Sequence, residues 1–373
     1  MVLGTSGNVF AQYKLTASTE GINLKIIPVA LSVPTTLTGA PVVPTTTNPS
    51  LGRVSVYVSD SETGTQTLVG APVAIKANGT ATVDITGSAL LIPKDQSKFL
   101  TLKADLNSKD DGTSAALIGL GLGDASGDVS DWGTNGAASA TAKSYNITAT
   151  GDASGTTITA TAINSTANAT TGTISASYNM EVFAGLLTVT RSASQPSGLL
   201  GGANQELLKF DLTATGDSIT INDLEFTYTH NCTNTSATAQ SVVQSSDKAV
   251  TYATWGAGTA WLGDAATTNR SVKVLGTQDA TERGAGGFDT ALTIGSGETK
   301  TLVFTGDTSG CTSTNQTFQV SIDAGKAGTR ATNTTLTSGI KWQDSKMVAA
   351  STTGIDSTVV TKTLPVNGPT FSK

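Results

Sequence analysis

Histidine, cysteine and charged residues are scarce in this 373-residue chain. It has one His and two Cys, and charged residues make up 13% of it, against about 25% in an ordinary soluble domain. These counts exclude a His-rich metal site, a four-Cys zinc site and an iron–sulfur cluster. A net charge of −6 without a basic run argues against nucleic acid or anionic lipid as a partner. The longest apolar run, Ala115–Gly123, is broken by glycine and far too short to span a membrane, so we expect no membrane insertion.

Threonine, serine and glycine take the place of the missing charge. The chain has 66 Thr, 37 Ser and 40 Gly, residues that favour strands and turns over helices. Apolar and polar residues alternate over 13–17, 22–26, 54–58 and 317–322, which is the period of a half-buried strand. No stretch shows a sustained helical stripe. We therefore predict an all-β protein built from Ig-like β-sandwich domains.

The chain also repeats itself. Phe10–Ser18 matches Leu207–Thr215 without a gap, and the apolar residues that follow keep the same phase in both copies. After an insertion, the block that begins at Leu90 matches the block that begins at Leu292. Two blocks in the same order indicate an internal duplication into tandem domains. We predict a first domain at 1–185, a second at 186–345, and a C-terminal linker or donor strand at 346–373.

The segments ahead of the two repeats differ. An extra strand, Leu187–Arg191, precedes the second repeat, whereas Met1 aligns with Gly198 and leaves no counterpart ahead of the first. The tail segment Thr358–Lys362 resembles this strand. Three interpretations are open: a fragment of a longer repeat protein, a terminal segment without a role, or a tail that completes the first domain of the next subunit by β-strand exchange. On the strand-exchange hypothesis, the assembly strand contains Val359, Val360, Thr361 and Leu364.

The composition is typical of an extracellular or cell-surface protein. Cys232 and Cys311 both follow predicted strands, and an oxidising compartment would let them pair into a disulfide; the alternative is two free thiols. No secretory leader is visible at Met1, so we expect the precursor to begin upstream. Nine Asn-x-Ser/Thr sequons, part of which composition alone explains, are glycosylation candidates. They are Asn78, Asn146, Asn164, Asn168, Asn231, Asn234, Asn269, Asn315 and Asn333.

One loop has the chemistry of a weak calcium site. A Gly/Ser-rich segment offers three carboxylates that could hold a structural calcium ion, although Asp in such loops more often makes Asx-turns. The three residues are Asp124, Asp128 and Asp131. We expect no other metal and no cofactor.

Catalytic chemistry finds little support. His230 lies two residues from Cys232, but a disulfide at Cys232 would remove the nucleophile. No Gly-x-Ser-x-Gly elbow is present, so we predict no catalytic residue and no enzyme. Trp255 and Trp261, in a Gly-rich insertion, could stack on sugar rings; the alternative is a role as loop anchors or subunit contacts.

The recurring motifs carry a family resemblance. Each repeat has the motif Phe/Tyr-x-Leu-Thr-Ala-Ser/Thr, then Ile-Pro-Lys or Ile-Gly-Ser-Gly before a Leu-rich strand that ends in Asp; Gly339–Asp344 and the junction Leu364–Pro369 add to the pattern. Together they resemble the tandem Ig-like surface proteins of Patescibacteria. The resemblance implies an exported, cell-envelope or extracellular setting and transfers no catalytic residue.

These observations lead to two functional hypotheses. The first is a structural subunit of an extracellular polymer, either a filament or a surface layer, whose copies join head to tail by β-strand exchange, so that the partner is the chain itself. The alternative is a monomeric cell-surface adhesin or carbohydrate-binding stalk whose partners are surface glycans.

Overall fold

The chain folds into two compact units. The computed structural model describes residues 1–33, 48–76, 79–88, 90–123, 147–158, 180–232, 240–255, 269–275, 286–287, 292–322, 340–347, 355–356, 361 and 363–373. The first unit is Met1–Ala184 and the second is Gly185–Lys373. The segment 346–373, for which we predict a linker or donor strand, belongs to the second unit.

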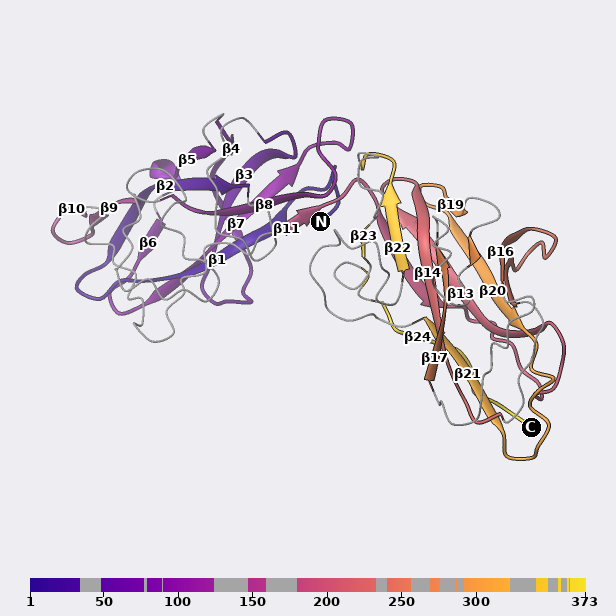
Figure 1. Ribbon diagram of the computed structural model, residues 1–373. Helices are drawn as coiled ribbons and strands as arrows, with labels where there is room; N and C mark the ends of the chain where they lie inside the picture. Colours follow the sequence, from indigo (N-terminus) through magenta and orange to yellow (C-terminus); the bar gives the residue numbers. More distant parts are fainter. Residues whose placement is uncertain are drawn as a thin grey trace. The chain divides into compact units, whose positions relative to one another are not determined.

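The first unit contains two sheets (Figure 1). The first sheet has the order β1 (Asn8–Thr16), β7 (Ser97–Leu106), β3 (Leu51–Ser59), β4 (Thr67–Ala74). The second sheet has the order β10 (Thr157–Ile158), β9 (Thr148–Gly151), β2 (Ile22–Ser32), β8 (Ala116–Leu122), β11 (Met180–Val182), and β2 also pairs with β5 (Thr80–Asp84) and β6 (Leu90–Ile92). A short 3-10 helix, Thr86–Ser88, is the one helical element among the described residues.

The second unit also contains two sheets. The first has the order β12 (Leu186–Arg191), β13 (Gln205–Thr215), β20 (Thr299–Gly306), β15 (Gln240–Gln244), β16 (Thr251–Trp255). The second has the order β18 (Gly286–Gly287), β17 (Asn269–Leu275), β14 (Ile219–His230), β21 (Thr317–Ile322), β24 (Val366–Asn367). Four short strands extend it by pairing with β14, β21 or β22: β19 (Leu292–Ile294), β22 (Ile340–Asp344), β23 (Ile355–Asp356) and β25 (Phe371–Ser372).

The two sheets of each unit pack their apolar faces together. In the first unit, the backbone N–H of Leu122 on β8 donates to the hydroxyl of Tyr13 on β1 at 3.2 Å, within the core. In the second unit, the ring of Phe226 on β14 lies 5.7 Å from Phe210 and 4.6 Å from Phe304, both of the opposite sheet. The predicted all-β class is therefore confirmed, and each unit is sandwich-like. Every pairing between the named strands is antiparallel except that of β17 with β18.

Corresponding strands in the two units pair with the same irregularity. On β1, Phe10 is skipped between Val9, opposite Lys103, and Ala11, opposite Leu102. On β13, Leu207 is skipped in the same way, between two residues that pair with Thr305 and Phe304. The two residues that the gapless alignment matches, Phe10 and Leu207, thus both lie at a β-bulge. Strand β13 holds in the second unit the place that β1 holds in the first.

One disulfide joins the two sheets of the second unit. Cys232 follows β14 and is bonded to Cys311, which lies in the loop between β20 and β21. Both residues are fully buried. The imidazole Nδ1 of His230 accepts a hydrogen bond from the backbone N–H of Cys232 at 3.2 Å. The predicted pairing is confirmed, and Cys232 has no free thiol for nucleophilic chemistry.

We expect the disulfide to stabilise the second unit alone. A Cys232→Ala, Cys311→Ala double variant should lower the free energy of unfolding of that unit by about 2–5 kcal/mol, because the cross-link closes a long loop in the unfolded chain. Urea unfolding monitored by tryptophan fluorescence measures this change. Reducing agent should bring the wild type to the same midpoint and leave the variant unmoved. An unchanged second-unit transition in the double variant would contradict the prediction.

Candidate assembly site at the edge of the first sheet

Strand β12 covers the outer edge of β13 in the second unit. The two strands pair antiparallel from Leu186, opposite Thr215, to Arg191, opposite Phe210. Leu187 and Val189 point into the core and are 3% and 0% exposed. Strand β12 therefore supplies both a hydrogen-bonding partner and apolar side chains to this edge.

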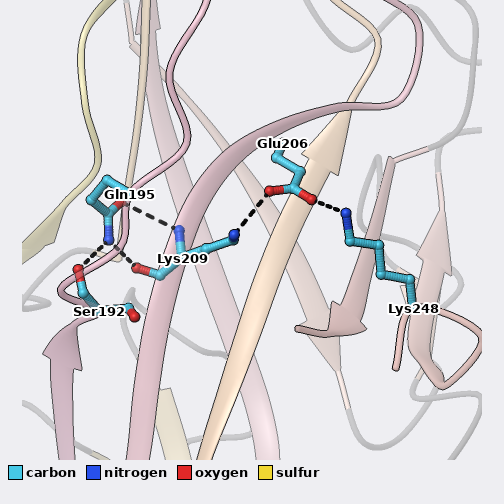
Figure 2. Close-up of polar contacts among 5 residues, drawn as sticks. All are labelled: Ser192, Gln195, Glu206, Lys209 and Lys248. Atoms are coloured by element: carbon cyan, nitrogen blue, oxygen red, sulfur yellow. Dashed lines mark hydrogen bonds and ion pairs between the residues drawn. The ribbon is translucent and has the colours of Figure 1, made fainter. Parts of the chain in front are cut away.

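A glutamine side chain extends this covering beyond the end of β12 (Figure 2). The amide nitrogen of Gln195 donates to the backbone oxygens of Ser192 at 2.8 Å and Lys209 at 2.7 Å. Its oxygen accepts from the backbone N–H of Lys209 at 3.4 Å. The side chain thus acts on β13 as one more strand residue would, because it satisfies a backbone donor and acceptor together.

The outer edge of β12 is also engaged. The backbone N–H of Val189 donates to the hydroxyl of Thr363 at 3.1 Å, so the C-terminal segment crosses this edge. A strand edge with free backbone groups is a template for pairing with other chains, and side chains that cross it block such pairing.

Charge also protects this region of the second unit. Figure 2 shows Glu206 between Lys209, at 3.2 Å, and Lys248. Partial burial raises the pKa of the Glu206 carboxyl, but hydrogen bonds from Lys248 and Lys209 lower it by more, and the net pKa lies below its usual value. The carboxylate is therefore charged at neutral pH and fixes both lysines beside β13.

Strand β1 is the terminal strand of its sheet. Among the described residues, no strand pairs with its outer side. The backbone groups of Ala17 point toward β7, since its N–H donates to Gln96 at 3.2 Å and its oxygen accepts from Asp95 at 2.7 Å. Backbone groups alternate in direction along an antiparallel strand, so those of Lys14 and Thr16 point outward.

The side chains of β1 show the same deficit. Tyr13 is 8% exposed, whereas Phe210 at the corresponding place on β13 is fully buried. Leu15 is half-buried, whereas its counterpart Leu212 is fully buried. The first sheet of the first unit thus lacks, within the described part of the chain, the covering that β12 gives to the second.

The structure describes part of the predicted assembly strand. Val359 and Val360 fall outside the described residues, while Thr361 is buried and Leu364 is half-buried in the second unit. Beyond them, β24 and β25 pair with β21 of the same unit. Strand β25 takes beside β21 the place that β11 takes beside β8 in the first unit.

The other predicted site residues are scattered or undescribed. The calcium candidates Asp124, Asp128 and Asp131 and the stacking candidate Trp261 lie outside the described residues, and Trp255 ends β16. Of the sequon asparagines, Asn231 and Asn315 are exposed, and Asn269 begins β17. The side chain of Asn231 accepts from Thr317 N–H at 2.6 Å and donates to the Asn315 carbonyl at 3.2 Å. The remaining sequons lie outside the described residues: Asn78, Asn146, Asn164, Asn168, Asn234 and Asn333.

Two further searches cover the described part of the chain only. It holds no cluster of three or more His, Cys, Asp or Glu side chains suited to a metal ion. No helix within it has the length and apolar character needed to cross a bilayer.

Comparisons with known proteins assign no family. No protein-family model and no curated protein matches the chain. A solved structure described as BspA_C_WT is 9% identical, with a TM-score of 0.21 over 86% of this chain and 89% of that one. A structure of manganese lipoxygenase of Gaeumannomyces graminis with partial zonadhesin of Komagataella pastoris is 11% identical, with a TM-score of 0.15 over 98% and 89%. Vicilin from tomato, Solanum lycopersicum, is 8% identical, with a TM-score of 0.12 over 83% and 72%. Scores this low carry no argument about function.

We expect Glu206 to stabilise the second unit in a pH-dependent way. Glu206→Gln should lower the free energy of unfolding at pH 7 by about 0.5–1 kcal/mol, the range of a partly exposed ion pair. A carboxylate whose pKa is lowered by folding stabilises above its unfolded pKa, and this stabilisation disappears as the pH falls through the folded value. The difference should therefore vanish by about pH 3.

Urea unfolding at pH 7 and pH 3 measures this effect. Glu62→Gln is the matched control, because Glu62 is exposed and no ion pair to it is among the described contacts. A difference of the same size at both pH values would contradict the electrostatic account of Glu206.

Proposed function

We propose that the chain is a structural subunit of an extracellular polymer, a filament or a surface layer, whose copies are joined by β-strand addition. The observation that carries the proposal is the outer edge of β1, with which no described strand pairs, at the place where β12 covers β13 in the second unit. Strand addition at such an edge gives a strong and directional contact through backbone hydrogen bonds. Repeated from copy to copy between unlike surfaces, such a contact builds an open chain.

The shared architecture of the units supports a tandem duplication of an Ig-like sandwich. Besides β1 and β13, the second sheets agree: Ile22 lies opposite Ile92, and Ile219 lies opposite Ile294 at the aligned positions. Among the described residues, a strand covers this edge in the second unit and none covers the corresponding edge of β1. We infer that a strand of a neighbouring molecule pairs with the edge of β1.

The disulfide and the composition support the extracellular setting. A buried disulfide persists in an oxidising compartment and is rare in the cytosol. A composition rich in threonine and poor in charge suits dense packing between subunits better than free diffusion.

The strand-exchange form of the proposal takes the donor from the tail of a neighbouring copy. The donor residues are then Val359, Val360, Thr361 and Leu364. Because Thr361 is buried and Thr363 binds β12 in the single chain, this segment has to leave its own unit as it enters the next. Such an exchange resembles domain swapping.

The alternative is a monomeric adhesin or a carbohydrate-binding stalk. It depends on the loop from Trp255 to Trp261, and the side chains of both tryptophans lie outside the described residues. No observation among the described residues favours it, so it enters as an outcome of the test.

A proline on the open edge tests the proposal. The outward N–H of Lys14 is not part of the ladder with β7, so Lys14→Pro should leave the first unit folded while it blocks strand addition. Electron microscopy of native material should show polymers, and the variant should remain as single particles. Lys14→Thr, which keeps the backbone donor, is the matched control and should polymerise.

Two results would overturn the polymer. Native material that is monodisperse would move the assignment to the adhesive stalk, which glycan-array binding would then examine. Polymers of Lys14→Pro indistinguishable from those of the wild type would show that β1 is not the contact.

A further inference from the structure

The second unit shows in which direction and register a strand would pair with the outer edge of β1; we call this position the seat. In the second unit, β12 runs antiparallel to β13, with Val189 opposite Leu212 and Leu187 opposite Ala214. The aligned residues of β1 are Leu15 and Ala17, and the pairing of β1 with β7 copies that of β13 with β20. The second unit therefore shows how an incoming strand would lie on the first.

The core side of this seat requires apolar side chains. Val189 is fully buried and lies opposite Leu212, which is also fully buried. Leu15 at the corresponding place packs against the core of its unit but stays half-buried. An apolar side chain opposite Leu15 would cover it as Val189 covers Leu212, and burial of apolar area is the main source of affinity in strand addition.

On the sheet face that points away from the core, β1 and β13 carry opposite charges at the aligned position. On β13 the outward residue opposite Thr190 is Asp211, whose carboxylate accepts a hydrogen bond from Thr301 at 2.6 Å. On β1 the aligned residue is Lys14, which is exposed. Opposite charges that face each other across two strands attract, and like charges repel. The seat on β1 therefore favours an acidic residue where β12 has Thr190.

The corresponding edge of the second unit is closed to the same ligand. Strand β12 and the Gln195 amide occupy the outer side of β13, and Thr363 binds the outward N–H of Val189. No described strand occupies the corresponding edge of β1, so we expect a free strand of this pattern to bind the first unit.

We propose that the β1 edge is a binding site for an antiparallel strand that alternates apolar and polar residues as β12 does and that carries an acidic residue opposite Lys14. This inference rests on the proposed strand addition for its biological role. It assigns the donor to a strand of another molecule with this chemistry, and not to the tail segment 358–364, which has no acidic residue.

Peptide binding to the full-length chain tests the proposal. The probe is a fluorescent peptide with the sequence of Gly185–Ser192, titrated by anisotropy. We expect saturable binding to the wild type and loss of at least tenfold in affinity for Lys14→Pro. The same peptide with Thr190→Asp should bind the wild type about two- to five-fold more tightly. A scrambled peptide of the same composition should not bind.

A charge reversal keeps the test independent of any folding defect. Lys14→Glu preserves the backbone donor, so it should still bind the original peptide while its preference for the Thr190→Asp peptide is reversed. Equal binding of the original and scrambled peptides, or of the original peptide to the wild type and to Lys14→Pro, would overturn the site. An unchanged preference in Lys14→Glu would overturn the assigned acidic residue.

Two other occupants are distinguished in the same assay. A peptide of Thr358–Leu364 that binds more tightly than the β12 peptide would overturn the assigned pattern in favour of the tail. The wild type could instead form a dimer that does not bind the peptide and that Lys14→Pro abolishes. This result would overturn the assigned donor and show that β1 of a second copy pairs with the edge.

The outcome separates this site from the proposed polymer. If the chain binds the peptide but its native material is monodisperse, the binding site on β1 is supported and the polymer is refuted. If the native material forms polymers but the chain does not bind the peptide, the polymer is supported and the binding site on β1 is refuted.

Discussion

Each strand of a β-sheet has two hydrogen-bonding edges, and the outermost strands leave one edge without a sheet partner. How this constraint is met distinguishes the two units more than any other feature. In the second unit, β12, the Gln195 amide and the Thr363 hydroxyl engage the backbone along the margin of the sheet. In the first unit, β1 ends the sheet with no such covering among the described residues. Natural proteins protect long sheet edges, so an edge without a covering strand among the described residues supports the proposal of strand addition at β1.

The same constraint reaches the core through the side chains of the edge strand. An added strand contributes apolar residues as well as hydrogen bonds, and Leu187 and Val189 bury themselves beside β13. Without such a strand, Leu15 and Tyr13 are more exposed than their counterparts on β13. Backbone pairing and core burial are therefore two aspects of one deficit, and a single strand could correct both.

The sequence predicted local and repeated features well. Alternating residues predicted β1 and β2. The alignment matched Phe10 with Leu207, and the structure places both at a β-bulge, which the sequence pattern did not predict. The disulfide followed from the two cysteines. The role of Gln195 could not be foreseen, because a side-chain amide that pairs with a backbone leaves no periodic signal. Nor could the pairing of the tail with β21, since β24 and β25 are only two residues long and show no alternation.

Lys14 explains how an open edge can coexist with a discrete folded chain. A lysine on an edge strand discourages the addition of arbitrary apolar strands. An incoming strand has to remove water from the ammonium group, and this is unfavourable unless the strand carries an acidic residue opposite the lysine. The residue at the aligned place on β13, where β12 is already bound, is Asp211, which binds Thr301 within its own sheet. On β1, the charged residue Lys14 is exposed and can discourage unwanted strand pairing. On β13, which β12 covers, the charged residue Asp211 is instead hydrogen-bonded to Thr301 of the neighbouring strand. On the proposed strand addition, the same lysine that discourages indiscriminate pairing would also favour a strand of opposite charge, so that protection and specificity would arise from one side chain.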